Sequence, residues 1–450
     1  MTPQESVERA LQAAAHLHGC VVLVRESSEA VLRWANSTMT TNGHSTATRV
    51  TVIAFVAVEG GVAAGVVGSA EPTDPAVLVA AAEAAARDAG PADDATPLPE
   101  PTADDATWAD PAAVTTIGVF EKLAGDLGAV FDSPQRHYGF ASHEIVTTWL
   151  GTSTGIRRRW VQPTGSVELN VKTADLASSA WAGASTADFT DVDTAALAEV
   201  AARRLAWGAR RVTLPAGRYD TLLPPSAVAD LMIYLAWSMD GRSAQEGRSA
   251  LAGRVGERLT ALPLTLACDP AAPGLEYEPF LTTTRSDEGI SVFDNGAPTR
   301  RVDWVREGVI TELAYSRAEA AEFGTSFAPA GDNLLLTGGA DGALDDLVAA
   351  TERGLLLTCL WYIRLVDPTT LLLTGLTRDG VYLVEHGEVV AEVDHNFRFN
   401  YSPLDVLRTA SQVGTTERTL PREWKDWFTR AAMPPVRVPE FFMSSVSLGR

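Results

Sequence analysis

The chain has 450 residues, of which 46% are hydrophobic and 21% charged, so we expect two or three domains around a substantial core. Its net charge of −21 repels phosphate backbones and anionic lipid, which argues against nucleic-acid and membrane partners. No apolar stretch reaches the ~18 residues of a membrane span. The first residues show no basic and apolar signal-peptide pattern, so we expect a cytoplasmic protein.

The three cysteines are Cys20, Cys268 and Cys359. They are odd in number, far apart in the sequence and without CxxC spacing, which excludes a zinc ribbon or a disulfide framework. Such a set is typical of reduced, mostly buried thiols.

Residues 1–112 are predicted to form a mixed α/β domain. Apolar residues at helical spacing predict a helix over Ser6–Leu17, and Asp74 is expected to cap an Ala-rich helix over Pro75–Ala89. Strands are predicted at Val21–Val24, around Ala30–Trp34, from Val50, and at Val62–Val67 after a Gly-Gly turn. The Pro/Asp/Ala-rich residues 90–112 are typical of a linker or surface crossing.

Residues 113–215 are predicted to be a central α/β segment. The expected elements are a helix over Phe120–Val130, strands at His143–Trp149 and Val167–Val171, and a helix over Asp193–Trp207 that ends at Gly208. The sequence Leu214-Pro215-Ala216-Gly217 is the strongest domain boundary in the chain.

Residues 216–450 are rich in β-hairpin signals. Predicted strand pairs are Val302–Arg306 with Val309–Leu313, and Val381–Glu385 with Glu388–Val393, the second joined by a His-Gly turn. Short helices are expected over Ala227–Met239 and Asp345–Arg353. The chain is therefore predicted to be an α+β protein, with a mixed α/β N-terminal region followed by an antiparallel β-rich C-terminal domain.

The histidines do not form a recognisable zinc site. A zinc peptidase usually places two His on one helix beside a Glu base, but after His143-Glu144 the chain has Thr147 and Thr148 where a second ligand would be needed. An ordinary strand histidine is favoured at this position. His395 opens a polar cluster, and a solvated side chain is favoured there.

Two polar clusters are denser than a fold requires, Thr374–Gly380 and Asp394–Pro403. In the second cluster Asn396, Arg398 and Asn400 alternate with Phe397 and Phe399, so one face of a strand would be polar and the other apolar. The polar face could bind a peptide backbone or carboxylate. It could equally be an internal network that satisfies buried backbone groups.

Several segments, in the correct order over nearly the whole chain, resemble the TldD/PmbA family. They are Ser153-Thr154-Gly155, Val292–Pro298, Arg306–Ile310, Gly354–Leu357, Thr374–Gly380, Val384–Val390, Asn396–Asn400 and Ser402–Leu407. In this family a TldD subunit carries an HExxxH zinc motif and a cysteine near the C-terminus, and it pairs with a TldE (PmbA) subunit that lacks them.

The resemblance implies that this chain is of the TldE type. The segment Ala252–Glu257 resembles the part of the family that follows the HExxxH helix, which puts Met232, Ile233 and Trp237 at the positions of the first His, the Glu and the second His. These side chains cannot bind a metal or activate water. No cysteine follows Gly414. We therefore expect an apolar buried helix, no catalytic residue and no metal in this chain.

The resemblance further implies that a TldD-like HExxxH partner supplies zinc and that the pair cleaves extended peptides. The candidate residues for substrate or partner contact are Arg378, Asp379, Asn396, Arg398 and Asn400. Two alternatives stay open. One is a self-sufficient hydrolase with an unrecognised site, for example His143-Glu144 with a distant histidine. The other is a peptide-binding scaffold outside any proteolytic complex.

Overall fold

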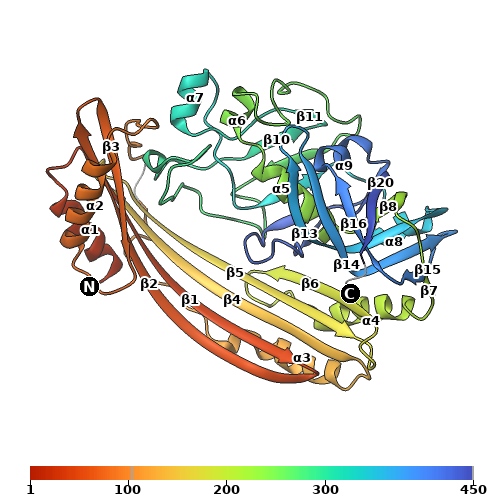
Figure 1. Ribbon diagram of the computed structural model, residues 1–450. Coiled ribbons are helices and arrows are strands. Elements are labelled where there is room, and N and C mark those ends of the chain that lie inside the picture. Colours follow the sequence, from red (N-terminus) through yellow and green to blue (C-terminus); the bar gives the residue numbers. More distant parts are fainter. Residues whose placement is uncertain (103–104, 448–450) are drawn as a thin grey trace.

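A long curved β-sheet forms the N-terminal half of the computed structural model, which describes residues 1–102 and 105–447 (Figure 1). The strand order is β3-β2-β1-β4-β5-β6, and every pairing is antiparallel. The strands are β1 (Gly19–Ala35), β2 (Thr38–Val58), β3 (Gly61–Ser69), β4 (Arg136–Thr152), β5 (Arg157–Lys172) and β6 (Ser179–Thr186). The helices are α1 (Pro3–Ala13), α2 (Pro75–Ala89), the 3₁₀ helix η1 (Ile117–Phe120), α3 (Glu121–Phe131) and α4 (Thr194–Trp207).

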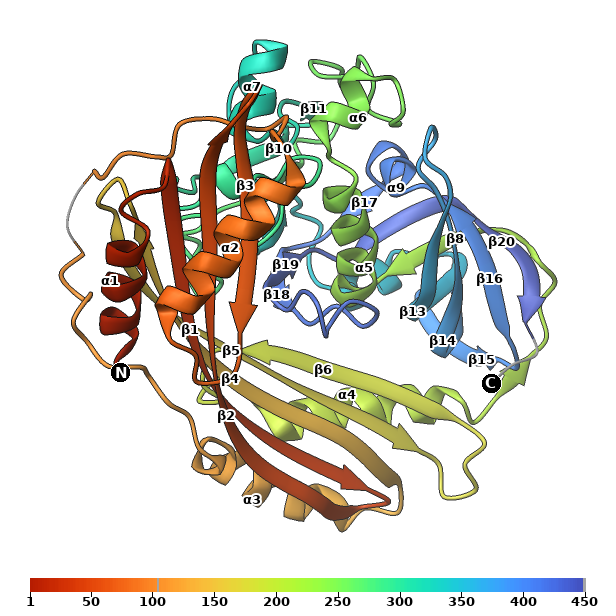
Figure 2. The same cartoon turned by 60° about the vertical axis from the view of Figure 1, so that its left-hand side comes forward.

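The helices cover one face of this sheet because alternate strand residues point to opposite sides. Val22 and Val24 pack in one cluster with residues of α1 and α2, and Leu32 packs in another with residues of α3 and α4. On the opposite face Val21 and Leu23 pack against the C-terminal half. Beyond them this second face carries mainly polar residues, and it faces the C-terminal strands (Figures 1 and 2).

The prediction of two separate strands within β1 is wrong. The predicted strands at Val21–Val24 and Ala30–Trp34 are parts of one 17-residue strand, because the polar run between them continues the ladder. Ser28 in that run is buried, and its hydroxyl donates to the carbonyl of Thr115 at 3.1 Å. Helix α1 also begins three residues before its predicted start, since Thr2 and Glu5 form a capping box at its N-terminus.

The C-terminal half contains two further sheets. One has the order β11-β10-β9-β12-β19-β18. The other runs β13-β8-β20-β16-β14-β15-β7, and an additional β13–β14 pairing closes β13, β8, β20, β16 and β14 into a small barrel. Most pairings are antiparallel, and β12–β19, β13–β8 and β15–β7 are parallel. The hairpin predicted from Val381–Glu385 and Glu388–Val393 is confirmed at β14–β15, where His386 (φ 53°) and Gly387 (φ 82°) form its turn.

The bounds of the C-terminal elements are as follows. The strands are β7 (Arg211–Val212), β8 (Gly217–Leu223), β9 (Thr265–Cys268), β10 (Val302–Arg306), β11 (Val309–Ile310), β12 (Leu334–Thr337), β13 (Arg353–Asp367), β14 (Leu372–Glu385), β15 (Glu388–Val393), β16 (Asn396–Tyr401), β17 (Gln412–Val413), β18 (Glu417–Thr419), β19 (Ala431–Met433) and β20 (Val436–Ser447). The helices are α5 (Pro225–Trp237), α6 (Gly241–Gln245), the 3₁₀ helix η2 (Val292–Asp294), α7 (Arg317–Phe323), α8 (Leu344–Ala349) and α9 (Pro403–Thr409).

Helix α5 is the centre of the largest hydrophobic cluster. Its residues pack against the barrel strand β13, against β12 and β19 of the other sheet, and against α9. The helix is therefore apolar around almost its whole circumference, as is typical of a helix enclosed by other elements. Among the described residues, no helix has the length and hydropathy needed to cross a membrane.

Candidate functional site

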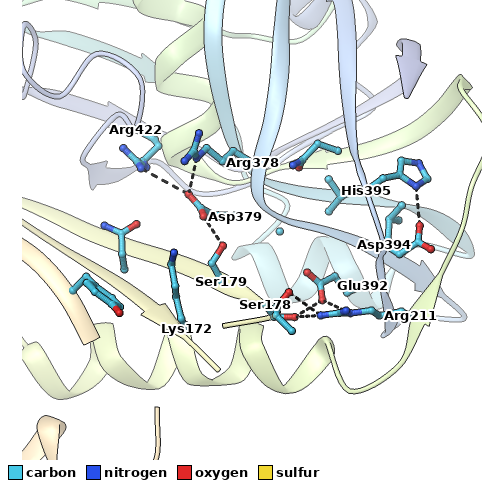
Figure 3. Close-up of a pocket in the computed structure, with 17 residues that line it drawn as sticks. Lys172, Ser178, Ser179, Arg211, Arg378, Asp379, Glu392, Asp394, His395 and Arg422 are labelled. Carbon is cyan, nitrogen blue, oxygen red and sulfur yellow. Dashed lines mark hydrogen bonds and ion pairs between the residues drawn. The ribbon is translucent and has the colours of Figure 1, made fainter. Parts of the chain in front are cut away.

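A polar cavity lies between the N-terminal sheet and the C-terminal barrel (Figure 3). Its volume is about 360 Å³. The sheet contributes Tyr138 of β4, Asn170 and Lys172 of β5, and Ser179 of β6. Arg211 of β7 also lines the cavity. The other lining residues of the C-terminal half are Arg378, Asp379, Gly380, Val381, Glu392, Val393, Asp394, His395, Asn396 and Arg422. The cavity therefore exists only when both halves are folded and packed.

A β-bulge in β14 turns Asp379 toward this cavity. The register of β13 against β14 shifts so that Thr358 stands opposite both Asp379 and Gly380. The Thr358 hydroxyl donates to the Asp379 carbonyl at 3.0 Å or to the Gly380 carbonyl at 3.1 Å. Asp379 has φ 49° and Gly380 has φ 129°. Bulges redirect single side chains in this way and are common beside binding sites.

Asp379 is the centre of a group of charged side chains that crosses the cavity. Its carboxylate accepts a hydrogen bond from the Ser179 hydroxyl at 2.7 Å and forms longer ion pairs with Arg422 at 3.7 Å and Arg378 at 3.8 Å. Arg422 also lies 3.8 Å from Glu168 of β5. The side chains of Asp379 and Arg422 are each only 10% exposed, so water screens these charges weakly.

A second group surrounds Glu392 on the other side of the cavity. Its carboxylate accepts a hydrogen bond from the Ser178 hydroxyl at 2.7 Å, and Arg211 lies 3.4 Å away. Arg211 also donates to the Ser178 hydroxyl oxygen at 2.7 Å. Figure 3 shows this group apart from the Asp379 group, with Lys172 pointing from β5 toward Ser179.

His395 is buried, so the expectation of a solvated side chain is wrong. Its side chain is 5% exposed, and its ring packs edge-on against Phe397 with the ring centres 4.8 Å apart. Nδ1 lies 2.8 Å from a carboxylate oxygen of Asp394. Nε2 has no hydrogen-bond partner among the described residues. A buried imidazole nitrogen without a partner is unusual and is a candidate contact for a ligand.

Residues 216–445, just over half of the chain, match the family described as the PmbA/TldA metallopeptidase C-terminal domain. The chain belongs to this PmbA/TldD family. The fold resembles TldE from Thermococcus kodakarensis, with a TM-score of 0.79 and 16% identity over 97% of this chain and 99% of the other. Comparison with curated protein sequences gives no significant match.

Two further solved structures share the fold over almost their full lengths. One is a proposed modulator of a DNA gyrase from Thermotoga maritima, with a TM-score of 0.76 and 17% identity over 99% of this chain and 100% of the other. The second is a proposed modulator of DNA gyrase from Bacteroides thetaiotaomicron, with a TM-score of 0.74 and 15% identity over 98% of each chain.

In this PmbA/TldD family member, α5 holds Met232, Ile233 and Trp237, the positions at which the sequence resemblance predicts the zinc motif. Met232 and Ile233 are fully buried in the core. Trp237, the last residue of α5, is 50% exposed, so the expectation that it would be buried with them is wrong. Its ring packs on Trp424 with the ring centres 5.0 Å apart. The helix ends at Trp237, which explains why this side chain escapes the core.

The motif positions do not fit a zinc ion. A thioether, a sec-butyl group and an indole offer no nitrogen, thiolate or carboxylate ligand of the kind that zinc requires. Over residues 1–102 and 105–447, no group of three or more His, Cys, Asp and Glu side chains is placed to hold a metal ion. Nothing in the chemistry of α5 therefore supports metal-assisted hydrolysis at this position.

Asp230 is the one side chain of α5 that carries a carboxyl group. It is fully buried, and its carboxylate accepts a hydrogen bond from the backbone N–H of Glu423 at 2.9 Å. The indole of Trp424 donates to the Asp230 carbonyl at 2.8 Å. Burial raises the pKa of Asp230 well above its usual value. Helix α5 thus anchors the segment that carries Arg422 into the cavity.

His143 and Glu144 do not form a catalytic pair. They are consecutive on β4, so their side chains point to opposite faces of the sheet. His143 is buried, with Nδ1 2.7 Å from the Thr115 hydroxyl and Nε2 2.7 Å from the Ala187 carbonyl. Both ring nitrogens are occupied, which is the arrangement of a structural histidine.

The thiols are equally unsuited to nucleophilic catalysis. Cys20, Cys268 and Cys359 are free and buried, as the sequence predicted. Burial raises the pKa of Cys20 and Cys359 to about 12 and that of Cys268 to about 11. These thiols stay protonated near neutral pH, whereas the thiolate is the reactive form.

The structure brings some of the predicted contact residues together. Arg378, Asp379 and Asn396 line the cavity, whereas Arg398 and Asn400 lie further along β16. Asn400 accepts a hydrogen bond from the Ser444 hydroxyl at 2.7 Å, and Arg398 donates to the Thr374 hydroxyl at 3.4 Å. Arg398 and Asn400, on the polar face of β16, therefore each form a hydrogen bond with a neighbouring strand.

Sequence reasoning missed several lining residues. Asn170 and Lys172 on β5 had a detectable signal, since they alternate with the buried Leu169 and Val171. Arg211 and Arg422 gave no local signal. They reach the cavity only through contacts between segments that lie far apart in the sequence.

Proposed function

We propose that this protein is a cytoplasmic, non-catalytic TldE-type subunit of a TldD-type zinc metallopeptidase complex. The observation that carries the proposal is the burial of Met232 and Ile233, at the positions where we expect the zinc motif, in a chain that belongs to the family. A structural match to TldE over 97% of the chain supports it. In this proposal zinc and the base belong to an HExxxH partner, and this chain helps to hold an extended peptide.

The substrate or partner contacts in this proposal are Arg378, Asp379, Asn396, Arg398 and Asn400. The first three are supported by their position on the cavity wall. The last two are supported by the polar face that they form with Asn396 on β16.

Co-expression with an HExxxH relative from the same genome tests the proposal. We expect the two chains to co-elute on size exclusion, zinc to copurify with the pair, and a peptide without stable structure to be cleaved by the pair only. Stoichiometric zinc in the isolated chain, or cleavage by it, would instead support a self-sufficient hydrolase. Peptide binding without co-elution would support a scaffold.

The contact residues are tested in the same reconstituted pair. Arg398→Ala and Asn400→Ala should reduce cleavage while co-elution is retained. Arg136→Ala is a suitable control, because Arg136 is exposed at the start of β4 and does not line the cavity. Unchanged cleavage by both β16 variants would remove these two residues from the proposal.

A further inference from the structure

The lining of the cavity at Asp379 has a small excess of basic over acidic residues, in a protein that is acidic as a whole. Its lining contains four basic residues, Lys172, Arg211, Arg378 and Arg422, and three acidic ones, Asp379, Glu392 and Asp394. The whole chain, in contrast, has a net charge of −21. A local excess of basic groups within such a field attracts an anion to this cavity rather than to the surrounding surface.

Hydrogen-bonding capacity is left unused within this lining. The pairs of Asp379 with Arg378 and Arg422 are 3.8 and 3.7 Å long, beyond hydrogen-bond distance. Accordingly Asp379 Oδ2 and Arg422 Nε have no hydrogen-bond partner among the described residues, and neither has the buried Nε2 of His395. Unsatisfied buried polar groups are costly to a fold, and a bound polar molecule can satisfy them.

Lys172 is the basic group that is most available to a ligand. Within the part of the chain that the structure describes, it has no carboxylate within 4.0 Å, and its amine lies 5.7 Å from the centre of the Tyr138 ring. The other two lysines are paired, Lys122 with Asp126 at 2.8 Å and Lys425 with Glu168 at 3.3 Å. Figure 3 shows the Lys172 side chain pointing toward Ser179 and Asp379.

The mixed lining selects among anions. Three carboxylates on the wall oppose a dianionic phosphate more strongly than a monoanionic carboxylate. The same carboxylates and the side-chain amides of Asn170 and Asn396 can accept hydrogen bonds from peptide N–H groups. A volume of about 360 Å³ lies at the lower end of the range for small-molecule sites, about 300–1,000 Å³.

From these observations we propose that the cavity binds the C-terminal carboxylate of a peptide, with Lys172, Arg378 and Arg422 as its cationic contacts. The inference rests on the proposed role in peptide contact. It goes further by specifying which part of the peptide this chain recognises. A free chain end, rather than an internal segment, would then be held between the sheet and the barrel. Its test uses the isolated chain, so it does not depend on pairing with another subunit.

Lysine protection in the isolated full-length chain tests the proposal. The chain is treated with trace N-hydroxysuccinimidyl acetate, and acetylation at Lys122, Lys172 and Lys425 is followed by peptide mass spectrometry. The probe is N-acetyl-tetra-alanine with a free C-terminal carboxylate. At about ten times its Kd it should slow acetylation of Lys172 by about tenfold and leave Lys122 unchanged.

Two matched probes test whether the group that binds is the carboxylate at the chain end. The same peptide with a C-terminal amide should give no protection. An amide-capped peptide with one internal Glu separates a side-chain carboxylate from a chain end, and equal protection by it would overturn the assignment to the chain end. Equal protection by the amide, or none by the free acid up to millimolar concentration, would overturn the carboxylate site itself.

Variants provide a second measurement. Calorimetric titration of the free-acid peptide should show about a tenfold weaker affinity for Lys172→Gln and for Arg378→Gln, since each removes one charge-assisted contact. Lys122→Gln is the control, because Lys122 is an exposed lysine on α3, which packs against the face of the sheet opposite the cavity. Unaltered affinity in both cavity variants, with circular dichroism showing folded protein, would contradict the proposed contacts.

Discussion

Asp230 gives α5 a pH-dependent contribution to stability. Because burial raises its folded-state pKa above the unfolded value of about 3.9, the folded protein holds this proton more tightly. The resulting stability is fully present below about pH 3.9 and is lost as the pH rises through the folded pKa. The side chain thus makes the fold less stable at neutral pH than a neutral group of the same shape would.

Asp230→Asn should therefore stabilise the protein at high pH. Asparagine keeps the oxygen that accepts from the Glu423 N–H and cannot ionise. We expect a gain on the order of 1–3 kcal/mol at pH 8 that shrinks toward pH 4, measured by urea unfolding across this range. Asp193→Asn is the control, since Asp193 is an exposed N-cap and Asn caps equally well. A loss of stability at pH 8 would contradict the assignment.

Substitutions at Met232 and Trp237, the two positions at which we expect the histidines of the zinc motif, should differ in their cost to stability. Met232→Ala removes a fully buried side chain and should cost about 2–5 kcal/mol. Trp237 is 50% exposed, so Trp237→Ala should cost mainly its aromatic contact with Trp424, about 0.5–1.5 kcal/mol. Urea unfolding of both variants measures this difference. Equal losses would mean that Trp237 belongs to the core after all.

At the scale of elements, the bulge in β14 depends on glycine. A Cβ on Gly380 would lie 2.4 Å from the Tyr382 ring and 2.7 Å from the Thr358 hydroxyl, and its φ of 129° is rare for other residues. Gly380→Ala should therefore destabilise the protein by roughly 1–3 kcal/mol and displace Asp379 from the cavity.

A second glycine provides the matched control for this prediction. Gly125 lies in α3, and a Cβ there meets nothing within 4 Å. Gly125→Ala should stabilise the protein by about 0.5–1 kcal/mol, because alanine is the better helix former. Opposite signs for the two substitutions in thermal or urea unfolding would support the bulge geometry, and the same sign would contradict it.

The elements that the sequence predicted well carry their own local signals. The Asp193 cap and Gly208 end placed α4 almost to the residue, and the His386-Gly387 turn fixed the β14–β15 hairpin. The failures occurred where tertiary contacts replace such signals. The polar middle of β1 stays in the sheet because Ser28 bonds to a distant loop, and the bulge at Asp379 depends on Thr358 of a neighbouring strand.

At the scale of the whole molecule, polar contacts beside the cavity join the sheet to the C-terminal half, in addition to the apolar packing of Val21 and Leu23. Glu168 of the sheet accepts from the Trp181 indole at 3.0 Å and lies 3.3 Å from Lys425 and 3.8 Å from Arg422. Its side chain is 14% exposed. Alternation along β5 predicts that Glu168 lies on the polar face. The sequence alone, however, does not indicate that residues 422–425 supply the opposing charges.

Removing Glu168 should therefore weaken the junction between the two halves. Glu168→Ala leaves Arg422 and Lys425 mostly buried without their shared carboxylate, and we expect a loss of about 2–4 kcal/mol in urea unfolding. Glu385→Ala is the control, because Glu385 pairs with the exposed Arg353 at 3.5 Å and should cost less than about 1 kcal/mol.

Limited proteolysis tests where in the chain Glu168→Ala lowers stability. If Glu168 joins the halves, tryptic cleavage should increase in Glu168→Ala at the segment between α4 and β8, where the chain passes from the sheet to the barrel. Glu385→Ala should show the wild-type pattern. Similar stability and identical cleavage in both variants would mean that apolar packing, and not this charged junction, fixes the cavity between sheet and barrel.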